Sequence, residues 1–400
     1  MVNINTGNLG SGLLKEAISR AKDGNIDAKD LTALIKTAEK NNLSKDEKAF
    51  LIGLMDQSNV TQLKSSTSNQ SPISIQFNEP SANATKNLEI DMQVLSNGGD
   101  ENSVKKINQM NPQLREKFSF LLNNVSNKSE LISLLNSGKL TMLDSTPRRV
   151  MENISDMIQG PNKPGVNGKQ LAEETISILN DRNNITQGQH GTCGAGALQN
   201  HLWSKDPAEL VRITKDLAKN GEATLRDGTK LKAGTGSLNW HSGSTMTGGS
   251  SENRKDFNII FQSAVMRNVA LIGGDRAFGN AYIHDLADYN VNNDNGDSKS
   301  VRSGDSAANP VLLTSLSESI MGKSVSNKVW NAFDKMKEAA NTGKQPIALY
   351  SADRVVDLHY VVIQKVDDKD VYFQNTQSGT LDSMPVAEFK KRLKSSIIDD

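Results

Sequence analysis

The chain is short of four things: cysteine, aromatic residues, net charge and long apolar runs. A single cysteine in 400 residues excludes an intramolecular disulfide and any metal site built on a cysteine pair. Lysine plus arginine number 46, as do aspartate plus glutamate, so the net charge of zero predicts neither a nucleic-acid footprint nor an acidic tail. No apolar run reaches the roughly 18 residues of a membrane-spanning helix, so no membrane span is expected.

Hydrophobic residues make up 36% of the chain and aromatic residues 4%, which is lean for a globular protein. Part of the length is therefore expected in linkers, above all in the Asn/Ser-rich stretches. Residues 1–7 have neither a basic start nor an apolar core, so a cleaved Sec signal is not expected. The protein is predicted to be cytoplasmic or exported by a route that needs no such signal.

The order of the remaining patterns predicts an α+β fold in four parts. A small helical region is expected over 1–56, a Ser/Asn/Gln/Thr-rich linker over 57–87, and a second helical region over 88–164. The last part, 165–400, begins with helices and ends with strands near 346–350, 358–366 and 370–374. Within the first region, residues 23–27 have part of a calcium-loop pattern, but Ser19 and Ala21 stand at its first ligand positions, which favours a plain turn.

The single cysteine, Cys193, ends the sequence Q-G-Q-H-G-T-C at 187–193 and begins a predicted helix with a small-residue face. A packed core thiol is the ordinary interpretation of a lone cysteine, but it leaves the neighbouring glycines and glutamines unexplained. An ordinary thiol has a pKa of about 8.5, so only a few per cent is ionised at neutral pH. A helix N-terminus and an adjacent imidazole both favour the thiolate. The position of the cysteine therefore indicates a nucleophile.

A histidine and an asparagine far downstream supply the groups that such a nucleophile needs. His359 lies at the start of one predicted strand, and Asn375 ends the next strand, 16 residues later (375 − 359). In an antiparallel hairpin that turns at 367–369, the two side chains come within reach of each other. The imidazole can take the thiol proton, and the amide can orient the ring through one hydrogen bond.

The attacked carbonyl becomes an oxyanion, which two hydrogen-bond donors must stabilise. The backbone N–H of Cys193 and the side chain of Gln187 are expected to do this, with Gln189 as the alternative amide. His284, next to Asp285, is the alternative base, but it borders a long polar loop rather than a strand pair. The remaining histidines, at 190, 201 and 241, are expected on the surface or in supporting positions.

Q-G-x-x-G-x-C at 187–193, followed by His359 and Asn375, resembles the papain family and its wider clan of cysteine peptidases. The resemblance covers 181–205 and 345–380. It implies a papain-like two-subdomain fold over 165–400, with the nucleophile helix in a helical subdomain and the histidine and asparagine in an antiparallel β subdomain. It also implies that Gln187, Cys193, His359 and Asn375 act as oxyanion donor, nucleophile, general base and orienting residue. The expected substrate is a protein or peptide, and no cofactor or metal is implied.

Three features depart from the family's pattern. Gly194 stands where an aromatic residue usually follows the nucleophile, Gln377 stands where a tryptophan usually shields the asparagine, and the family's disulfide cysteines are missing. Two other functions therefore stay open: a glutamine deamidase, transglutaminase or acyltransferase acting on proteins, and an inactive peptidase-like interaction protein. The N-terminal helices are expected either to inhibit the catalytic domain in cis or to bind a partner.

Overall fold

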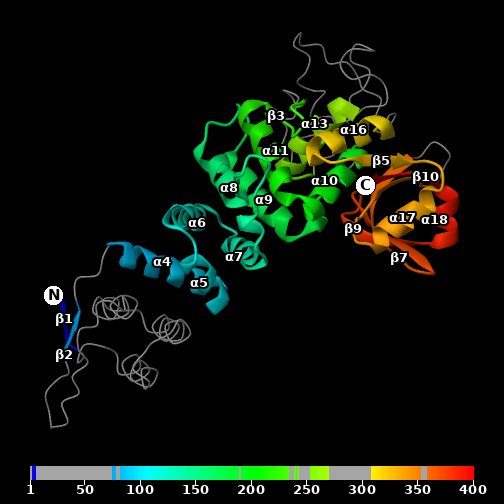
Figure 1. The fold of residues 1–400 in the computed structure, drawn as a ribbon. Coiled ribbons are helices and arrows are strands. Elements are labelled where there is room, and N and C mark those ends of the chain that lie inside the picture. Colours follow the sequence, from blue (N-terminus) through cyan, green and yellow to red (C-terminus); the bar gives the residue numbers. More distant parts are fainter. Residues whose placement is uncertain are drawn as a thin grey trace. The chain divides into compact units, whose positions relative to one another are not determined.

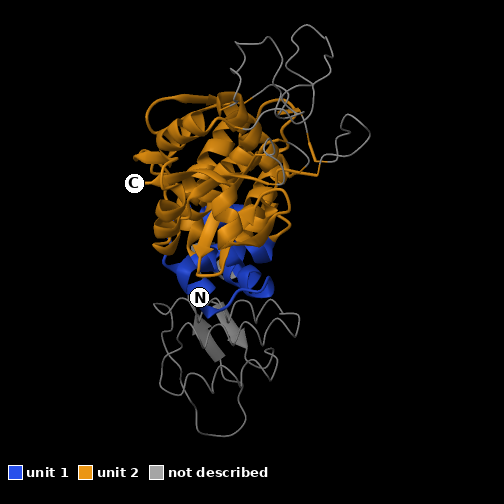
Figure 2. Ribbon diagram, turned by 90° about the vertical axis from the view of Figure 1, so that its right-hand side faces the viewer, with its two compact units in different colours: residues 1–123, 128–137 blue, residues 124–127, 138–400 orange. Residues whose placement is uncertain are grey.

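A computed structural model describes residues 2–5, 74–77, 82–188, 191–233, 238–239, 241–242, 253–269, 308–352 and 358–400. The helices and the calcium-loop pattern expected within 10–56 lie outside the described residues. The contacts divide the chain into two compact units (Figure 2). Unit 1 comprises Met1–Asn123 and Lys128–Ser137, and unit 2 comprises Asn124–Asn127 and Gly138–Asp400.

Unit 1 contains a strand pair and a series of helices. Strand β1 (Val2–Asn5) pairs antiparallel with β2 (Ser74–Phe77), so part of the segment that the sequence predicts as a linker is paired β structure. The helices are α4 (Ala82–Ser96), α5 (Glu101–Asn108), α6 (Pro112–Asn124) and α7 (Lys128–Ser137). Apolar residues at helical spacing on α6 and α7 are buried, and the described part of 88–137 consists mainly of helices.

Unit 2 begins with helices, shown mostly in green in Figure 1. They are η3 (Lys139–Thr141), α8 (Val150–Gln159), α9 (Gly168–Asn180), η4 (Arg182–Asn184), α10 (Cys193–Lys205), α11 (Pro207–Asn220), α13 (Asp256–Val269) and α16 (Pro310–Met321). The sequence places the start of this domain at 165, whereas the contacts place it near 138, because α8 packs against α9 and α11. A short hairpin that turns at Asp227-Gly228 consists of β3 (Glu222–Thr224) and β4 (Lys230–Lys232).

The second half of unit 2 is built on a six-stranded sheet. Its strands are β5 (Val325–Lys328), β6 (Ile347–Ser351), β7 (Leu358–Val366), β8 (Asp370–Asn375), β9 (Thr380–Pro385) and β10 (Leu393–Asp399). Their order is β5-β10-β6-β7-β8-β9, and every neighbouring pair is antiparallel. Helices followed by an antiparallel sheet confirm the predicted α+β class. None of the helices in the described ranges is long and apolar enough to cross a bilayer.

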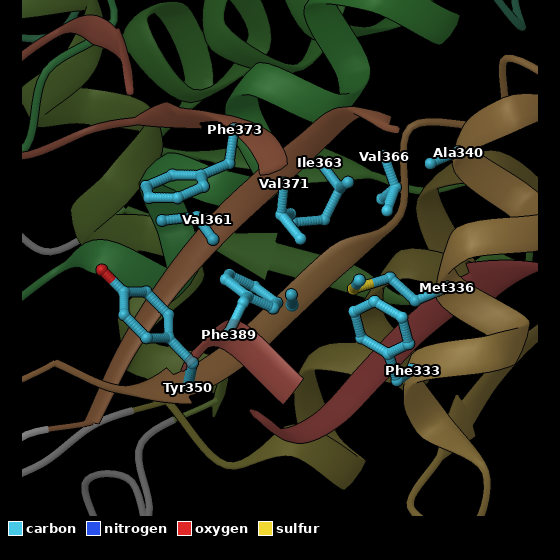
Figure 3. Packing of buried hydrophobic residues seen from close by; sticks show 11 residues of the cluster. Phe333, Met336, Ala340, Tyr350, Val361, Ile363, Val366, Val371, Phe373 and Phe389 are labelled. Atoms are coloured by element: carbon cyan, nitrogen blue, oxygen red, sulfur yellow. The ribbon is translucent and has the colours of Figure 1, made fainter. Parts of the chain in front are cut away.

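The two faces of this sheet have different neighbours because strand side chains alternate. On one face, aromatic and β-branched residues of β6, β7 and β8 form a core with α17 (Ala332–Asn341) and α18 (Val386–Arg392) (Figure 3). Phe389 of α18 lies in the middle of it, stacked on Tyr350 at a centroid distance of 5.4 Å and near Phe373 at 5.8 Å. Each such buried ring contributes on the order of 1.5–3 kcal/mol. The opposite face packs against α10.

Candidate active site

Cys193 is the first residue of α10, and the next nine residues of that helix are all buried. The preceding residue, Thr192, makes no side-chain capping bond to the helix, and its hydroxyl instead donates to Gln262 Oε1 of α13 at 2.9 Å. The Cys193 sulfur therefore lies at the positive end of the helix dipole, where backbone N–H groups have no intrahelical partner. Only 5% of the residue is exposed, so the thiol lies in a largely water-excluded position.

A buried amide network joins the start of α10 to α13 and to the loop before the cysteine. Gln262 Nε2 donates to Gln199 Oε1 at 2.9 Å and to the Thr186 carbonyl at 3.0 Å. Gln199 Nε2 donates to Asn258 Oδ1 at 2.8 Å, and Asn258 Nδ2 donates to the Asn184 carbonyl at 2.8 Å. Because these groups are buried and satisfied, the network fixes the loop and the helix start relative to each other. Nothing in the local sequence indicates it, since its bonded partners are 59 to 76 residues apart.

The small residues that follow the cysteine let α10 approach the sheet closely. A Cβ placed on Gly194 would lie 3.3 Å from the Tyr360 ring, and a Cβ on Gly196 would lie 3.0 Å from Thr376 Cβ. Burial raises the pKa of the Tyr360 hydroxyl above its ordinary value, and the nearby Cys193 charge raises it further. The first turn of α10 therefore contacts the residues that directly follow His359 and Asn375 in the sequence.

His359 and Asn375 are joined by a hydrogen bond, as their spacing predicts. The imidazole Nε2 lies 2.9 Å from Asn375 Oδ1, and the backbone N–H of Gln377 donates to the same oxygen at 3.0 Å. A carbonyl oxygen only accepts hydrogen bonds, so the His359 proton is on Nε2. The ring also makes an edge contact with Tyr350, at a centroid distance of 5.9 Å. His359 is 7% exposed, so its orientation is set by protein groups rather than by water.

Gln187 lies against the residue that follows Asn375. Its backbone N–H donates to the Thr376 carbonyl at 2.8 Å, and its Oε1 accepts from the Thr376 hydroxyl at 2.8 Å. The next residue, Gly188, has a φ of 58°, and a Cβ there would lie 2.4 Å from Asn253 Oδ1, so glycine is needed for this bend. The alternative amide, Gln189, and its neighbour His190 lie outside the described residues.

The other histidines that the sequence considers have separate roles or lie outside the described residues. His201 is buried within α10, with Nδ1 2.9 Å from the Gln345 carbonyl and Nε2 3.2 Å from Asp399 Oδ1 of β10. His241 Nδ1 lies 2.9 Å from Asp256 Oδ2 at the start of α13. His284 is outside the described ranges. Within those ranges, no group of three or more histidine, cysteine, aspartate or glutamate residues is arranged to hold a metal ion.

Comparisons with known proteins return no match. No family model, no curated protein and no solved structure matches the chain. A functional assignment therefore rests on the chemistry of the site itself: a thiol at a helix N-terminus, an imidazole fixed by an amide, and a second amide fixed by Thr376.

Proposed function

We propose that the protein is a cysteine peptidase with a papain-like arrangement, in which α9 to α13 form one lobe and the six-stranded sheet forms the other. The observation that carries the proposal is the His359 Nε2 to Asn375 Oδ1 bond, on two strands whose next residues lie against the first turn of α10. The bond leaves Nδ1 as the nitrogen that accepts the Cys193 proton. This is the tautomer that a general base for a thiol requires.

The reaction follows from these roles. His359 Nδ1 takes the thiol proton, and the Cys193 sulfur attacks the amide carbonyl of the substrate to give a tetrahedral oxyanion. The imidazolium then gives this proton to the leaving amine as the carbon–nitrogen bond breaks, which leaves a thioester on Cys193. A water molecule, deprotonated by His359, attacks the thioester and releases the acid, and the thiolate recovers its proton from the imidazolium. The substrate is a protein or peptide, and no cofactor takes part.

The oxyanion is stabilised by the Cys193 N–H and by the side-chain amide of Gln187. The support for Gln187 is its hydrogen bond to Thr376. Because the Thr376 hydroxyl donates to Oε1, the NH₂ end of the Gln187 amide is directed away from Thr376 and can serve as the donor. Loss of one such donor typically costs about 10²–10³ in kcat.

The experiment is a mass-spectrometric search for products. The full-length protein is incubated with a denatured protein mixture and with a peptide library, beside a Cys193→Ala variant. The proposal predicts new peptide termini in the wild-type reaction only. Intact peptides that carry the mass gain of glutamine deamidation, or new cross-links, would instead favour the deamidase or transglutaminase alternative. Unmodified substrates together with an inert Cys193 would favour the interaction-protein alternative.

A further inference from the structure

We propose that Asp382 is a positioning residue of this site, which fixes the Asn375 amide and adds negative charge behind the His359–Asn375 pair. The inference rests on the proposed function, since it concerns the base of that reaction. Asp382 lies on β9, an edge strand that the sequence does not predict, so the sequence alone suggests no role for this residue.

The geometry places a carboxylate directly against the orienting amide. Asp382 Oδ2 accepts a hydrogen bond from Asn375 Nδ2 at 2.8 Å, and its Oδ1 accepts one from the Thr380 hydroxyl at 2.7 Å. In the antiparallel register, Asn375 pairs with Thr380 and Phe373 pairs with Asp382. Asp382 is thus the diagonal neighbour of Asn375 on the same face of the sheet, which is close enough for side chains to meet. The Thr380 hydroxyl bond holds the carboxylate in this rotamer.

Only one assignment of donors and acceptors satisfies the hydrogen bonds from Asp382 through Asn375 to His359. An ionised carboxylate only accepts hydrogen bonds, so the NH₂ group of Asn375 must face Asp382. The amide oxygen of Asn375 then faces His359 Nε2, which must carry the proton. Nδ1 is thereby left as the nitrogen that accepts from the thiol. Asp382 and the Gln377 N–H, which donates to Asn375 Oδ1 at 3.0 Å, therefore select the tautomer of His359 together, through the orientation of one amide.

The carboxylate charge also favours the imidazolium that forms when Cys193 gives up its proton. Asp382 and Asn375 are half-buried, so the charge acts through a medium between protein interior and water. Across one amide group, such a charge is expected to shift the protonation of the imidazole by about one pH unit. A residue that merely closed the β8–β9 hairpin would stabilise the fold but would not shift this titration.

The single cysteine makes the test site-specific without a substrate, since Cys193 is the only thiol that iodoacetate can alkylate and the modified residue is identified by mass spectrometry. Iodoacetate is an anion, so its reaction with a thiolate is fastest while the neighbouring imidazolium keeps its proton, and the rate falls at the alkaline limb where that proton is lost. The rate is measured from pH 5 to 10 for wild type, Asp382→Asn and His359→Ala. Asp368→Asn is the matched control, because Asp368 lies exposed in the β7–β8 turn, 3.8 Å from Lys337.

The expected result is an alkaline limb about one pH unit lower in Asp382→Asn and unchanged in Asp368→Asn. An Asp382→Asn profile that overlays wild type overturns the inference, even if the variant melts at a lower temperature. Wild-type and His359→Ala profiles that coincide would show that the proposed function itself is wrong. These two failures are therefore distinguishable.

A charge swap provides a second test that does not depend on the stability of one variant. Asn375→Asp alone places two carboxylates against each other, and their repulsion disturbs the hydrogen bonds that fix the His359 ring. Adding Asp382→Asn restores one amide donor facing one carboxylate acceptor. We expect the double variant to be alkylated at pH 7 about tenfold faster than Asn375→Asp alone. A double variant no faster than the single one would contradict the direct contact between the two side chains.

Discussion

Replacement of Gly194 by alanine is expected to destabilise unit 2, although alanine is the better helix former. The helix-propensity gain from glycine to alanine is at most about 1 kcal/mol. The new Cβ would lie 2.5 Å from Ala308 Cβ and 3.3 Å from the Tyr360 ring, closer than van der Waals contact allows. Such overpacking costs about 1–3 kcal/mol. The net expectation is a loss of about 1 kcal/mol in the free energy of unfolding.

Ala308 cannot move aside without breaking other contacts. Its carbonyl accepts the Tyr360 hydroxyl at 2.8 Å, and the next residue, Asn309, donates its N–H to the Val269 carbonyl at 2.6 Å. The clash is therefore expected to push the start of α10 away from β7. If Cys193 and His359 pair as in the proposed function, this displacement also weakens the pairing, so the alkylation rate at neutral pH should fall together with the stability.

The assay is urea denaturation of the full chain, with tryptophan fluorescence as the readout. Ala308→Gly serves as the second substitution that relieves the clash made by Gly194→Ala. Ala308→Gly removes the closest clashing carbon, so the double variant should recover most of the stability that Gly194→Ala loses. It should also recover the alkylation rate. A Gly194→Ala protein as stable as wild type, or one that Ala308→Gly does not rescue, would refute the reasoning about the close contact of helix and sheet.

Two further predictions concern single hydrogen-bonded groups. Thr376→Val removes the hydroxyl that holds Gln187 but keeps the side-chain volume. The kcat for a cleaved peptide should fall about 10- to 100-fold, while the free energy of unfolding changes by about 1 kcal/mol. An unchanged kcat would exclude Gln187 as an oriented oxyanion donor. For Asp399, burial alone would raise the pKa, but the bonds from His201 and Lys323 outweigh it and lower the pKa to about 2. The folded-state pKa lies below the unfolded value, so ionised Asp399 stabilises the fold above about pH 4, and this contribution to the free energy of unfolding is lost as the pH falls towards 2. It amounts to at most about 2 kcal/mol and less after solvent screening. Urea titrations should show this loss in wild type and a flatter acid dependence in Asp399→Asn, whereas parallel curves would contradict the assignment.

The parts of the fold that could be predicted from the sequence are those with a local pattern. β7 and β8 are runs of β-branched and aromatic residues around a polar turn, so their pairing and the contact of His359 with Asn375 followed from spacing alone. β3 and β4 flank Asp227-Gly228, a dipeptide typical of hairpin turns. Each helix from α8 to α11 has apolar residues at helical spacing or a residue that starts it, such as Pro207 at the start of α11.

The parts that could not be predicted depend on long-range pairing. β9 carries polar residues and is at least partly exposed along its length. β5 and β10 contain polar residues that interrupt the alternating apolar pattern by which a strand is predicted. These strands form because neighbouring strands accept their backbone hydrogen bonds. The sequence gives no indication of Asp382 because it gives none of β9. The buried amides of Gln199 and Gln262 are not indicated either, since their partners are 59 or more residues away in the sequence.

The transfer of the Cys193 proton to His359 can be tested directly by alkylation with uncharged iodoacetamide at pH 6 and at pH 10. At pH 10 a thiol is ionised with or without a neighbouring base, so wild type and His359→Ala should react at similar rates. At pH 6 the imidazolium is needed to hold the thiolate, so His359→Ala should react at least about tenfold more slowly than wild type. Equal rates at pH 6 would contradict a shared proton, and with it the assignment of Cys193 as the nucleophile.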